Sequence, residues 1–358
     1  MATSRRIALR RASGTIATLL VAGLLAAACG DDDTATTTAK GEDKGTTLVV
    51  YSGREQELVE PLYERFEQET GIKLDVRYGD SPALAAQVQE EGDRSPADVF
   101  YAQDAGAIGS LGTMLEPLAD DTLESVDAKF RAEDGRWIGI TGRVRALVYN
   151  TDEVTDGDLP ESILDVTDAA WKDRVGVAPT NASFIAWVSA LRLTSGDAAA
   201  TKFLEGLVAN GARTYEKNGA IVDAVAKGEV DLGLVNHYYL YEKLGQDAEL
   251  PIQNHYFADG DVGNLVNVSA AGVLASSKQQ EAASTFIEFL LDEGQHFIVE
   301  DAVEREYPLV QLDGLADSPR YKDLPALAGI KGPDVDLSQL GGEVAKTVEL
   351  IAASGLTS

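Results

Sequence analysis

The sequence predicts an α/β protein made of two lobes, each a doubly wound sheet flanked by helices. The first observation is that strand patterns and amphipathic helix patterns alternate from residue 47 onward, as they do in such sheets. The second is that the alternation starts again near residue 174. The third is length, because removal of residues 1–28 as a leader leaves 330 of the 358 residues, which is enough for two domains.

The first α/β unit opens with the apolar strand pattern TLVVY at residues 47–51. An amphipathic helix follows and ends at Gly71, and Pro61 places the start of this helix near Glu57, because proline is tolerated in the first turn. The pattern then predicts a strand at 72–78, a helix at 81–91 and a strand at 97–102.

The second unit repeats this order of elements without repeating the sequence. It has a strand at residues 174–180, a helix at 184–193, an extended segment at 212–218, a helix at 219–227 and a strand at 230–235. Two segments that flank this unit, ALVYN at 146–150 and VSAAGVL at 268–274, are candidates for strands that cross between the lobes. The predicted lobes are residues 46–145 with 270–312, and residues 146–269 with 313–358.

The first 28 residues have the features of an export signal peptide. Arginines precede an apolar, acid-free run at residues 16–28, and its 13 residues are fewer than the roughly 18 that a membrane-spanning helix needs. Arg5 and Arg6 after Ser4 resemble a twin-arginine signal, although Ala8 stands where that signal favours phenylalanine. The Sec and Tat export routes therefore both stay open.

Cys29 is the only cysteine of the chain, so a disulfide within one chain is impossible. It follows three alanines directly, and this stretch resembles a bacterial lipobox, which implies lipidation of Cys29 after cleavage. Residues 29–46 are polar and rich in threonine, which predicts a disordered tether. We expect the protein at the outer face of the cytoplasmic membrane, in contact with the membrane only through the lipid anchor.

The chain is strongly acidic, with a formal net charge of −29 that becomes −33 once the four leader arginines are removed. Nucleic acid and anionic lipid would repel such a protein, whereas a cationic ligand would be attracted. No Walker loop, GxGxxG after a strand or GxSxG motif occurs, and the three histidines lack zinc-binding spacing. The sequence therefore favours a binding protein over an enzyme, with an envelope hydrolase on a similar fold as the alternative from another class.

Ligands of open α/β sheets bind beyond the carboxyl ends of the strands, and this rule selects candidate residues. Glu55 follows the first predicted strand, Gln103 follows the third, and residues 181–183 follow the first strand of the second unit. The stretch LVNHYYLY places two adjacent tyrosines, Tyr238 and Tyr239, after the last strand of that unit. On a loop, both phenols can face the same cleft as Glu55.

Six motifs extend this pattern along most of the chain from Leu48 to about Leu309. They are YSGRE (51–55), RSPADVFYAQD (94–104), GRVRALVYNT (142–151), APTNASF (178–184), EKNGAIVDAVAKGEVDLGLVNHYY (216–239) and REYPL (305–309). In this order and spacing they resemble the ferric-ion-binding proteins of bacterial ABC importers. The resemblance implies a two-lobed periplasmic-binding-protein fold of type II, with two crossover strands and hinge closure around the ligand.

The resemblance also implies a set of ligand-binding residues. Two adjacent tyrosines bind Fe³⁺ in this family, and they match Tyr238 and Tyr239. Glu55 and Gln103 occupy the metal-binding positions where the family usually has a histidine and a glutamate, and Phe184 stands where some relatives have a third tyrosine. A small synergistic anion completes the family's metal site. The positions that match its binding residues are Asn181, Ala182, Ser183, Asn218 and Asn236, with Arg143 from the GRVR segment.

This ligand set suits ferric ion, which is a hard cation and prefers oxygen donors. Two phenolates and the Glu55 carboxylate supply three negative charges, which match the charge of Fe³⁺. A bound cation also favours the deprotonated form of a phenol, whose free pKa is about 10. An anion beside Asn181 would meet free backbone N–H groups at the start of a helix.

Each candidate residue also has a structural interpretation that the sequence leaves open. The tyrosine pair can pack at the edge of a lobe, and Glu55 can stabilise the first turn of the following helix. The remaining alternatives are a hydrogen-bonding or capping role for Gln103 and Asp104, a structural ion pair for Arg143 and Arg145, and a packing role for His237.

The sequence thus predicts a monomeric, lipid-anchored receptor that captures Fe³⁺ with an anion and delivers it to an ABC permease and its ATPase. The alternative is the same fold binding an organic solute, such as a polyamine, thiamine or a phosphonate. Glu55 and Gln103, which replace the family's histidine and glutamate, keep this alternative open.

Overall fold

The computed structural model describes residues 45–302 and 305–357. The predicted signal peptide at 1–28, the lipidation site Cys29 and all but the last two residues of the predicted tether at 29–46 lie outside the described residues.

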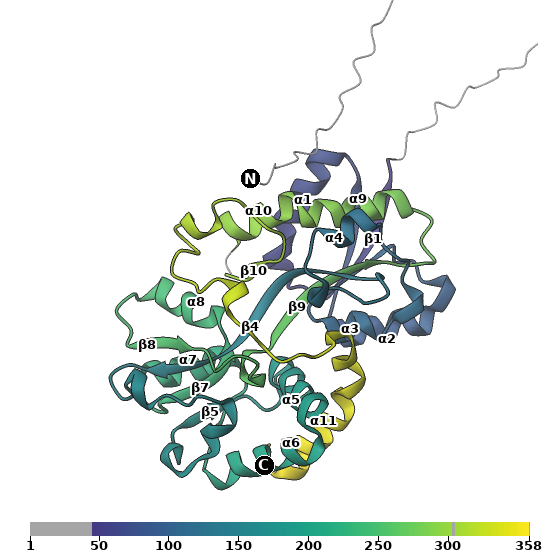
Figure 1. The fold of residues 1–358 in the computed structure, drawn as a ribbon. Helices are drawn as coiled ribbons and strands as arrows, with labels where there is room; N and C mark the ends of the chain where they lie inside the picture. Colours follow the sequence, from purple (N-terminus) through teal and green to yellow (C-terminus); the bar gives the residue numbers. More distant parts are fainter. Residues whose placement is uncertain (1–44, 303–304, 358) are drawn as a thin grey trace, which may run out of the picture. The chain divides into compact units, whose positions relative to one another are not determined.

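Ten strands of the described chain form one mixed sheet (Figure 1). Their order is β2-β1-β3-β9-β4-β7-β5-β6, and β8 and β10 each pair with β4. The strands are β1 (Thr47–Ser52), β2 (Lys73–Tyr78), β3 (Val99–Ala102), β4 (Ile138–Asn150), β5 (Val175–Val177), β6 (Arg213–Thr214), β7 (Leu232–Asn236), β8 (Ile252–His255), β9 (Val266–Val273) and β10 (Tyr307–Pro308).

Helices flank this sheet. They are α1 (Gln56–Thr70), α2 (Ser81–Glu91), α3 (Ala105–Gly109), α4 (Asp120–Glu124), α5 (Ala182–Ser195), α6 (Asp197–Ala209), α7 (Asn218–Ala226), α8 (Tyr238–Gln246), α9 (Gln280–Leu291), α10 (Glu293–Glu300) and α11 (Leu340–Ser354). None of the helices in the part of the chain that the structure describes combines the length and the apolar character needed to cross a membrane. Helix α1 begins one residue before the predicted Glu57, and Pro61 lies inside it rather than in its first turn.

The two predicted α/β units are both present. β1 pairs in parallel with β2 and β3, and β5 pairs in parallel with β6 and β7. Helices α1 and α2 connect the strands of the first unit, and α5, α6 and α7 connect those of the second. The α/β class predicted from the alternating patterns is therefore confirmed, while the exact lobe boundaries stay a prediction.

β4 carries the chain from one half of the sheet to the other. Its residues 138–144 pair with β9 and β10, whereas residues 145–150 pair with β7 and β8. All thirteen residues of β4 are buried, as expected for a strand covered on both faces. The predicted crossover at 146–150 is thus the second half of a longer strand.

The prediction that residues 268–274 form a second strand crossing between the lobes is wrong. β9 pairs with β3 and with the first half of β4, so it lies in one half of the sheet only. The return passage comes just before it, where the carbonyl of Leu265 accepts a hydrogen bond of 2.9 Å from the backbone N–H of Arg145.

Aromatic side chains pack in the hydrophobic cores of both units. Phe66 of α1 packs edge-on against Phe286 and Phe289 of α9, with ring-centroid distances of 5.0 and 5.2 Å. In the second unit, Phe184 of α5 is buried against Trp187 at 5.7 Å. Phe184, at the position of the third tyrosine of some relatives, is therefore a core residue here.

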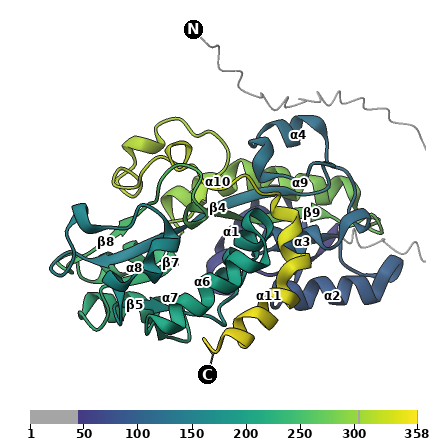
Figure 2. The same cartoon turned by 60° about the horizontal axis from the view of Figure 1, so that its bottom comes forward.

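Helix α11 packs on α5 and α6 of the second unit and on α3 of the first (Figures 1 and 2). The contact with α3 brings two backbones together. A Cβ atom on Gly341 would lie 2.1 Å from the carbonyl oxygen of Gly106, so only glycine fits here. A Cβ atom on the neighbouring Gly342 would meet nothing within 4 Å.

We expect Gly341→Ala to lower the free energy of unfolding by about 1–3 kcal/mol, because the added methyl group forces α11 away from α3. Gly342→Ala is the matched control, and it should raise that free energy by up to about 1 kcal/mol, since alanine favours a helix interior. Urea unfolding of both variants measures the difference. Equal losses in the two variants would show that the close backbone contact does not hold α11 in place.

Candidate metal and anion site

Tyr238 and Tyr239 are the first two residues of α8, which begins directly after β7 and His237. The prediction that the two tyrosines lie on a loop is therefore wrong, because they begin a helix. Successive helical residues point about 100° apart, yet the two rings lie against each other, with centroids 4.5 Å apart and an angle of 32° between their planes. Tyr238 is buried and Tyr239 is half-buried. The helix thus keeps both phenols together, as the loop interpretation required.

Arg145 of β4 lies next to the tyrosines. The register of the sheet pairs Arg145 with Asn236, the last residue of β7. The guanidinium donates to Ser183 Oγ and to Asn236 Oδ1, each at 3.0 Å, and the residue is only 5% exposed. Burial lowers the pKa of Arg145 to about 10, a fall that nearby Tyr239 and Tyr238 partly offset.

The hydrogen-bond partners of Arg145 are neutral. Within the described residues, no carboxylate forms an ion pair with its guanidinium. A buried cation without a counter-charge is unfavourable, and a bound anion or a neighbouring phenolate would relieve that cost. Arg145 is therefore a candidate site residue that the sequence interpretation left out of the predicted site.

The predicted anion-binding residues gather beside this guanidinium, at the start of α5. Asn181 caps the helix and accepts from the backbone N–H of Ser183 at 3.0 Å and from Ser183 Oγ at 2.6 Å. Asn218 Nδ2 donates to Ser183 Oγ at 3.1 Å, and the Asn218 Oδ1 atom is buried without a partner. Ala182 is the first residue of the helix. With Asn236, five of the six predicted residues lie together at a positive helix end.

Arg143, the sixth, makes different contacts. Its Nη2 donates to the backbone carbonyl of Gln103, and its Nε lies 3.7 Å from Glu306 Oε1. Glu306 also binds Arg54, at 3.3 and 3.0 Å. Of the two arginines in the GRVR segment, the structure places Arg145 at the helix start and ties Arg143 into a structural ion pair.

Gln103 and Asp104 follow β3, as predicted. Asp104 caps α3 by accepting from the backbone N–H of Ala107 at 3.0 Å. The backbone N–H of Gln103 donates to Ser81 Oγ at 2.8 Å, and its side-chain Oε1 is buried without a hydrogen-bond partner. The capping role of Asp104 is confirmed, and the side-chain oxygen of Gln103 remains available to a ligand.

Glu55 lies on the opposite side of a groove from α8. It is exposed, it occupies the residue before α1, and its side chain makes no capping hydrogen bond. The groove, about 630 Å³, is lined by Glu55 together with Tyr241 and Glu242 of α8. Burial raises the pKa of Glu242, and the charge of Glu55 adds to the rise. Because Glu242 lies one turn beyond Tyr238, Glu55 faces the same helix as the tyrosine pair.

His237 is a packing residue. Its Nδ1 accepts from the backbone N–H of Val144 at 3.2 Å, and its Nε2 lies 2.9 Å from the carbonyl oxygen of Arg305. The ring stacks on Tyr307 at 4.7 Å, and burial lowers the pKa of His237 to about 4. Both ring nitrogens are occupied, which confirms the packing interpretation. Nowhere in the described ranges do three His, Cys, Asp or Glu side chains gather at metal-binding spacing.

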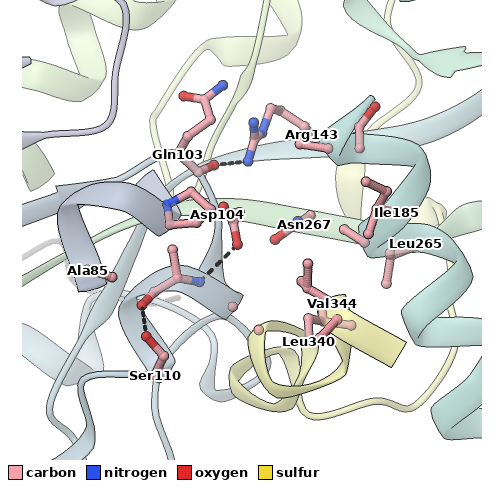
Figure 3. A pocket seen from close by; sticks show the side chains of 18 of the residues that line it. Ala85, Gln103, Asp104, Ser110, Arg143, Ile185, Leu265, Asn267, Leu340 and Val344 are labelled. Atoms are coloured by element: carbon pink, nitrogen blue, oxygen red, sulfur yellow. Dashed lines mark hydrogen bonds between the residues drawn. The ribbon is translucent and has the colours of Figure 1, made fainter. Parts of the chain in front are cut away.

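A cavity of about 510 Å³ lies beside the start of α5 (Figure 3), separate from the groove that Glu55 lines, and neither tyrosine is among its lining residues. Gln103, Arg143, Arg145, Ser183 and Asn236 line its polar part. The arrangement therefore offers two adjacent phenols, a carboxylate across a groove, a buried cation and the positive end of a helix. Such a site can hold a hard cation on the oxygens and an anion beside Arg145.

The chain is similar to known binding proteins over most of its length. The profile of the bacterial extracellular solute-binding protein family matches residues 51–296. The Fe(3+)-binding periplasmic protein of Serratia marcescens is 35% identical over 323 residues, which cover 89% of this chain and 92% of that protein. The major ferric iron-binding protein of Neisseria meningitidis serogroup B is 37% identical over 271 residues, 73% of this chain and 80% of that protein.

Solved structures show the same similarity. Iron-bound HitA from Pseudomonas aeruginosa is 35% identical with a TM-score of 0.76, and the match covers 87% of this chain and 99% of HitA. The Trichodesmium (IdiA) (FutA) protein in complex with iron and citrate is 26% identical with a TM-score of 0.74, covering 86% of this chain and 99% of that one.

Proposed function

The chain belongs to the family of bacterial extracellular solute-binding proteins, and from this premise we propose that it captures ferric iron with a synergistic anion. The observation that carries the proposal is the pair of adjacent phenols, Tyr238 and Tyr239, beside the buried guanidinium of Arg145. Relatives named as ferric iron-binding proteins and a solved iron-bound neighbour support the same ligand.

Different residues of this chain would bind the cation and the anion. Tyr238 and Tyr239 would bind Fe³⁺ as phenolates, with Glu55 as the carboxylate from the facing loop and Gln103 as a neutral oxygen donor. Asn181, Ala182, Ser183, Asn218 and Asn236 would hold the anion at the start of α5. Arg145 connects the metal-binding and the anion-binding residues, because it donates to Ser183 and Asn236 and lies near the two phenols. It would therefore keep the two bound ions adjacent.

We place the protein in an importer as the receptor that delivers iron to an ABC permease and its ATPase. Closure of the two halves about β4 and the segment before β9 would be the working motion. The relatives are named as binding and uptake proteins, which agrees with a carrier that performs no catalysis.

Titration of the metal-free protein with ferric nitrilotriacetate tests the proposal. A visible phenolate-to-iron band should grow to saturation at one iron per chain in the presence of bicarbonate or phosphate. Spermidine, thiamine and 2-aminoethylphosphonate serve as probes of the organic alternative, and none should raise the unfolding temperature as iron does. Stabilisation by one of these solutes, without any visible band from iron, would overturn the ferric assignment.

Anchoring through Cys29 is a separate part of the proposal. A Cys29→Ser variant should appear in the soluble extracytoplasmic fraction with unchanged iron binding, because a polar tether separates Cys29 from the fold. Cell fractionation and mass spectrometry of the mature N-terminus measure this. Parent protein that is secreted without a lipid would contradict it.

A further inference from the structure

The 510 Å³ cavity extends well beyond the residues that hold the anion. From the start of α5 it continues between α2, α3 and α11. Figure 3 shows Gln103 and Arg143 at one end, and Leu340 and Val344 of α11 at the other. An inorganic anion such as phosphate or carbonate, bound beside Arg145, would leave most of this volume unfilled, since cavities of this size usually hold organic ligands.

The two ends of the cavity differ in chemistry. The polar end holds the buried guanidinium of Arg145, whose hydrogen-bond partners are neutral, and the buried Oε1 of Gln103, which has no partner. The walls away from this end are mostly apolar. Ala85, Ala86, Ile185, Leu265, Leu340 and Val344 line them, and the polar residues Gln89, Ser110 and Asn267 also reach the cavity.

The apolar walls are partly open to water in the structure. Leu265 and Leu340 are buried, but Val344 is 37% exposed and is one of the few large hydrophobic side chains with that much exposure in the described ranges. Water gains little in a cleft with such walls, because it finds few hydrogen-bond partners there. A ligand with a hydrocarbon body would displace that water and bury the exposed apolar surface.

Among the described residues that line the cavity, Asp104 is the only acidic one. Its carboxylate accepts from the backbone N–H of Ala107 at the start of α3. Arg143 is paired with Glu306, whereas Arg145 has no carboxylate partner in the part of the chain that the structure describes. The cavity therefore favours one negative charge at the Arg145 end and an uncharged body towards α11.

We propose that the anion bound next to the iron is an organic carboxylate with an apolar body, larger than carbonate or phosphate. The carboxylate meets the guanidinium of Arg145, and the body lies between α2, Ile185 and Val344. This inference rests on the proposed function, because it names the class of the synergistic anion. It predicts that an aryl-alkanoate retains iron better than an inorganic anion does.

The test compares 4-phenylbutyrate with phosphate, bicarbonate and citrate as the only anion present. Iron retention against a competing chelator is read from the visible band, and binding of each anion to metal-free protein is read by calorimetry. We expect 4-phenylbutyrate to bind the metal-free protein and to strengthen iron retention about tenfold over phosphate, from burial of its hydrocarbon body.

Two variants of α2 locate the effect. Ala86 lines the cavity and Ala83 does not, and both side chains are exposed on the same helix. Ala86→Phe should fill the cavity and remove the advantage of 4-phenylbutyrate while leaving iron binding with phosphate unchanged. Ala83→Phe should behave as the parent does.

Equal iron retention with phosphate and 4-phenylbutyrate would overturn the inference, and so would 4-phenylbutyrate binding that survives Ala86→Phe. A protein that binds no iron with any anion would instead contradict the proposed function. Calorimetry on the metal-free protein would then still decide whether the cavity takes an organic carboxylate.

Discussion

Replacing either Tyr238 or Tyr239 with phenylalanine is expected to abolish the visible colour of the ferric protein and its tight iron binding. Each change removes one phenolate oxygen and keeps the ring, so the 4.5 Å ring contact persists. Changes in the outer shell of a metal site already cost roughly 10- to 100-fold in affinity, so the loss of a direct ligand should exceed about 100-fold. Spectrophotometric titration against a competing chelator measures the loss.

Tyr241→Phe is the matched control for these variants. Tyr241 lies on the same helix, and its hydroxyl group contacts the carbonyl oxygen of Asp323 at 3.4 Å. Burial raises the pKa of Tyr241 to about 12, so this phenol stays protonated in the protein. Its removal should leave colour and affinity as in the parent. Parent-like iron binding in both Tyr238→Phe and Tyr239→Phe would reduce the pair to a packing or stacking surface.

Glu55→Gln should lower the affinity for iron without removing the visible colour. The carboxylate is not the chromophore, so the variant should bind iron more weakly while it keeps much of the visible band. Acid should bleach the parent well below the free phenol pKa of about 10, because protons compete with the metal for the phenolates.

Glu306→Gln is expected to destabilise the fold more than any surface change. Glu306 is 2% exposed and binds Arg54 at 3.0 Å and Thr141 Oγ1 at 2.5 Å, with Arg143 at 3.7 Å. The amide keeps the shape of the side chain but removes the charge that two buried guanidiniums share. Breaking such a buried pair costs about 3–5 kcal/mol. Urea unfolding at pH 7 measures the loss.

The pH dependence of stability gives an independent check on Glu306. Burial raises the pKa of its carboxyl, but the charges of Arg54 and Arg143 outweigh burial and hold the pKa below its ordinary value of 4.5. Its contribution is therefore complete above about pH 4.5 and is lost as the pH falls through the lower pKa of the folded state. Glu306→Gln should lack that part of the acid dependence.

Asp259→Asn is the control for the Glu306 variant. Asp259 pairs with Lys331 at 2.6 Å, and both side chains are exposed. Exposed pairs contribute at most about 1 kcal/mol, so this variant should unfold nearly as the parent does. A loss of similar size in both variants would show that the buried ion pairs of Glu306 contribute no more to the free energy of unfolding than an exposed pair does.

The α/β class was predictable because apolar alternation is a local property of the chain. The choice between Arg143 and Arg145 was not. Residues two apart in a strand point to the same face, so both arginines satisfy the local pattern. Which of them meets Asn236 depends on where β4 changes partners from β9 to β7, and that point lies between Val144 and Arg145.

The start of α8 was missed for a related reason. His237, the residue before the helix, makes no side-chain capping bond, so the usual sequence signal for a helix start is missing. The helix start is fixed by long-range contacts instead. The backbone N–H of His237 donates to Val144 at 2.9 Å, and Asn254 donates to the carbonyl of His237 at 2.8 Å. The role of Glu306 was also not predictable from local sequence, because its partner Arg54 is 252 residues away in the chain.

The metal content and the visible spectrum of the protein, purified without an affinity tag from iron-replete cells, test the ferric assignment most directly. The account predicts close to one iron per chain and a visible band that dithionite removes. Protein that carries another metal, or that stays colourless and iron-free after incubation with ferric nitrilotriacetate and an anion, would contradict it.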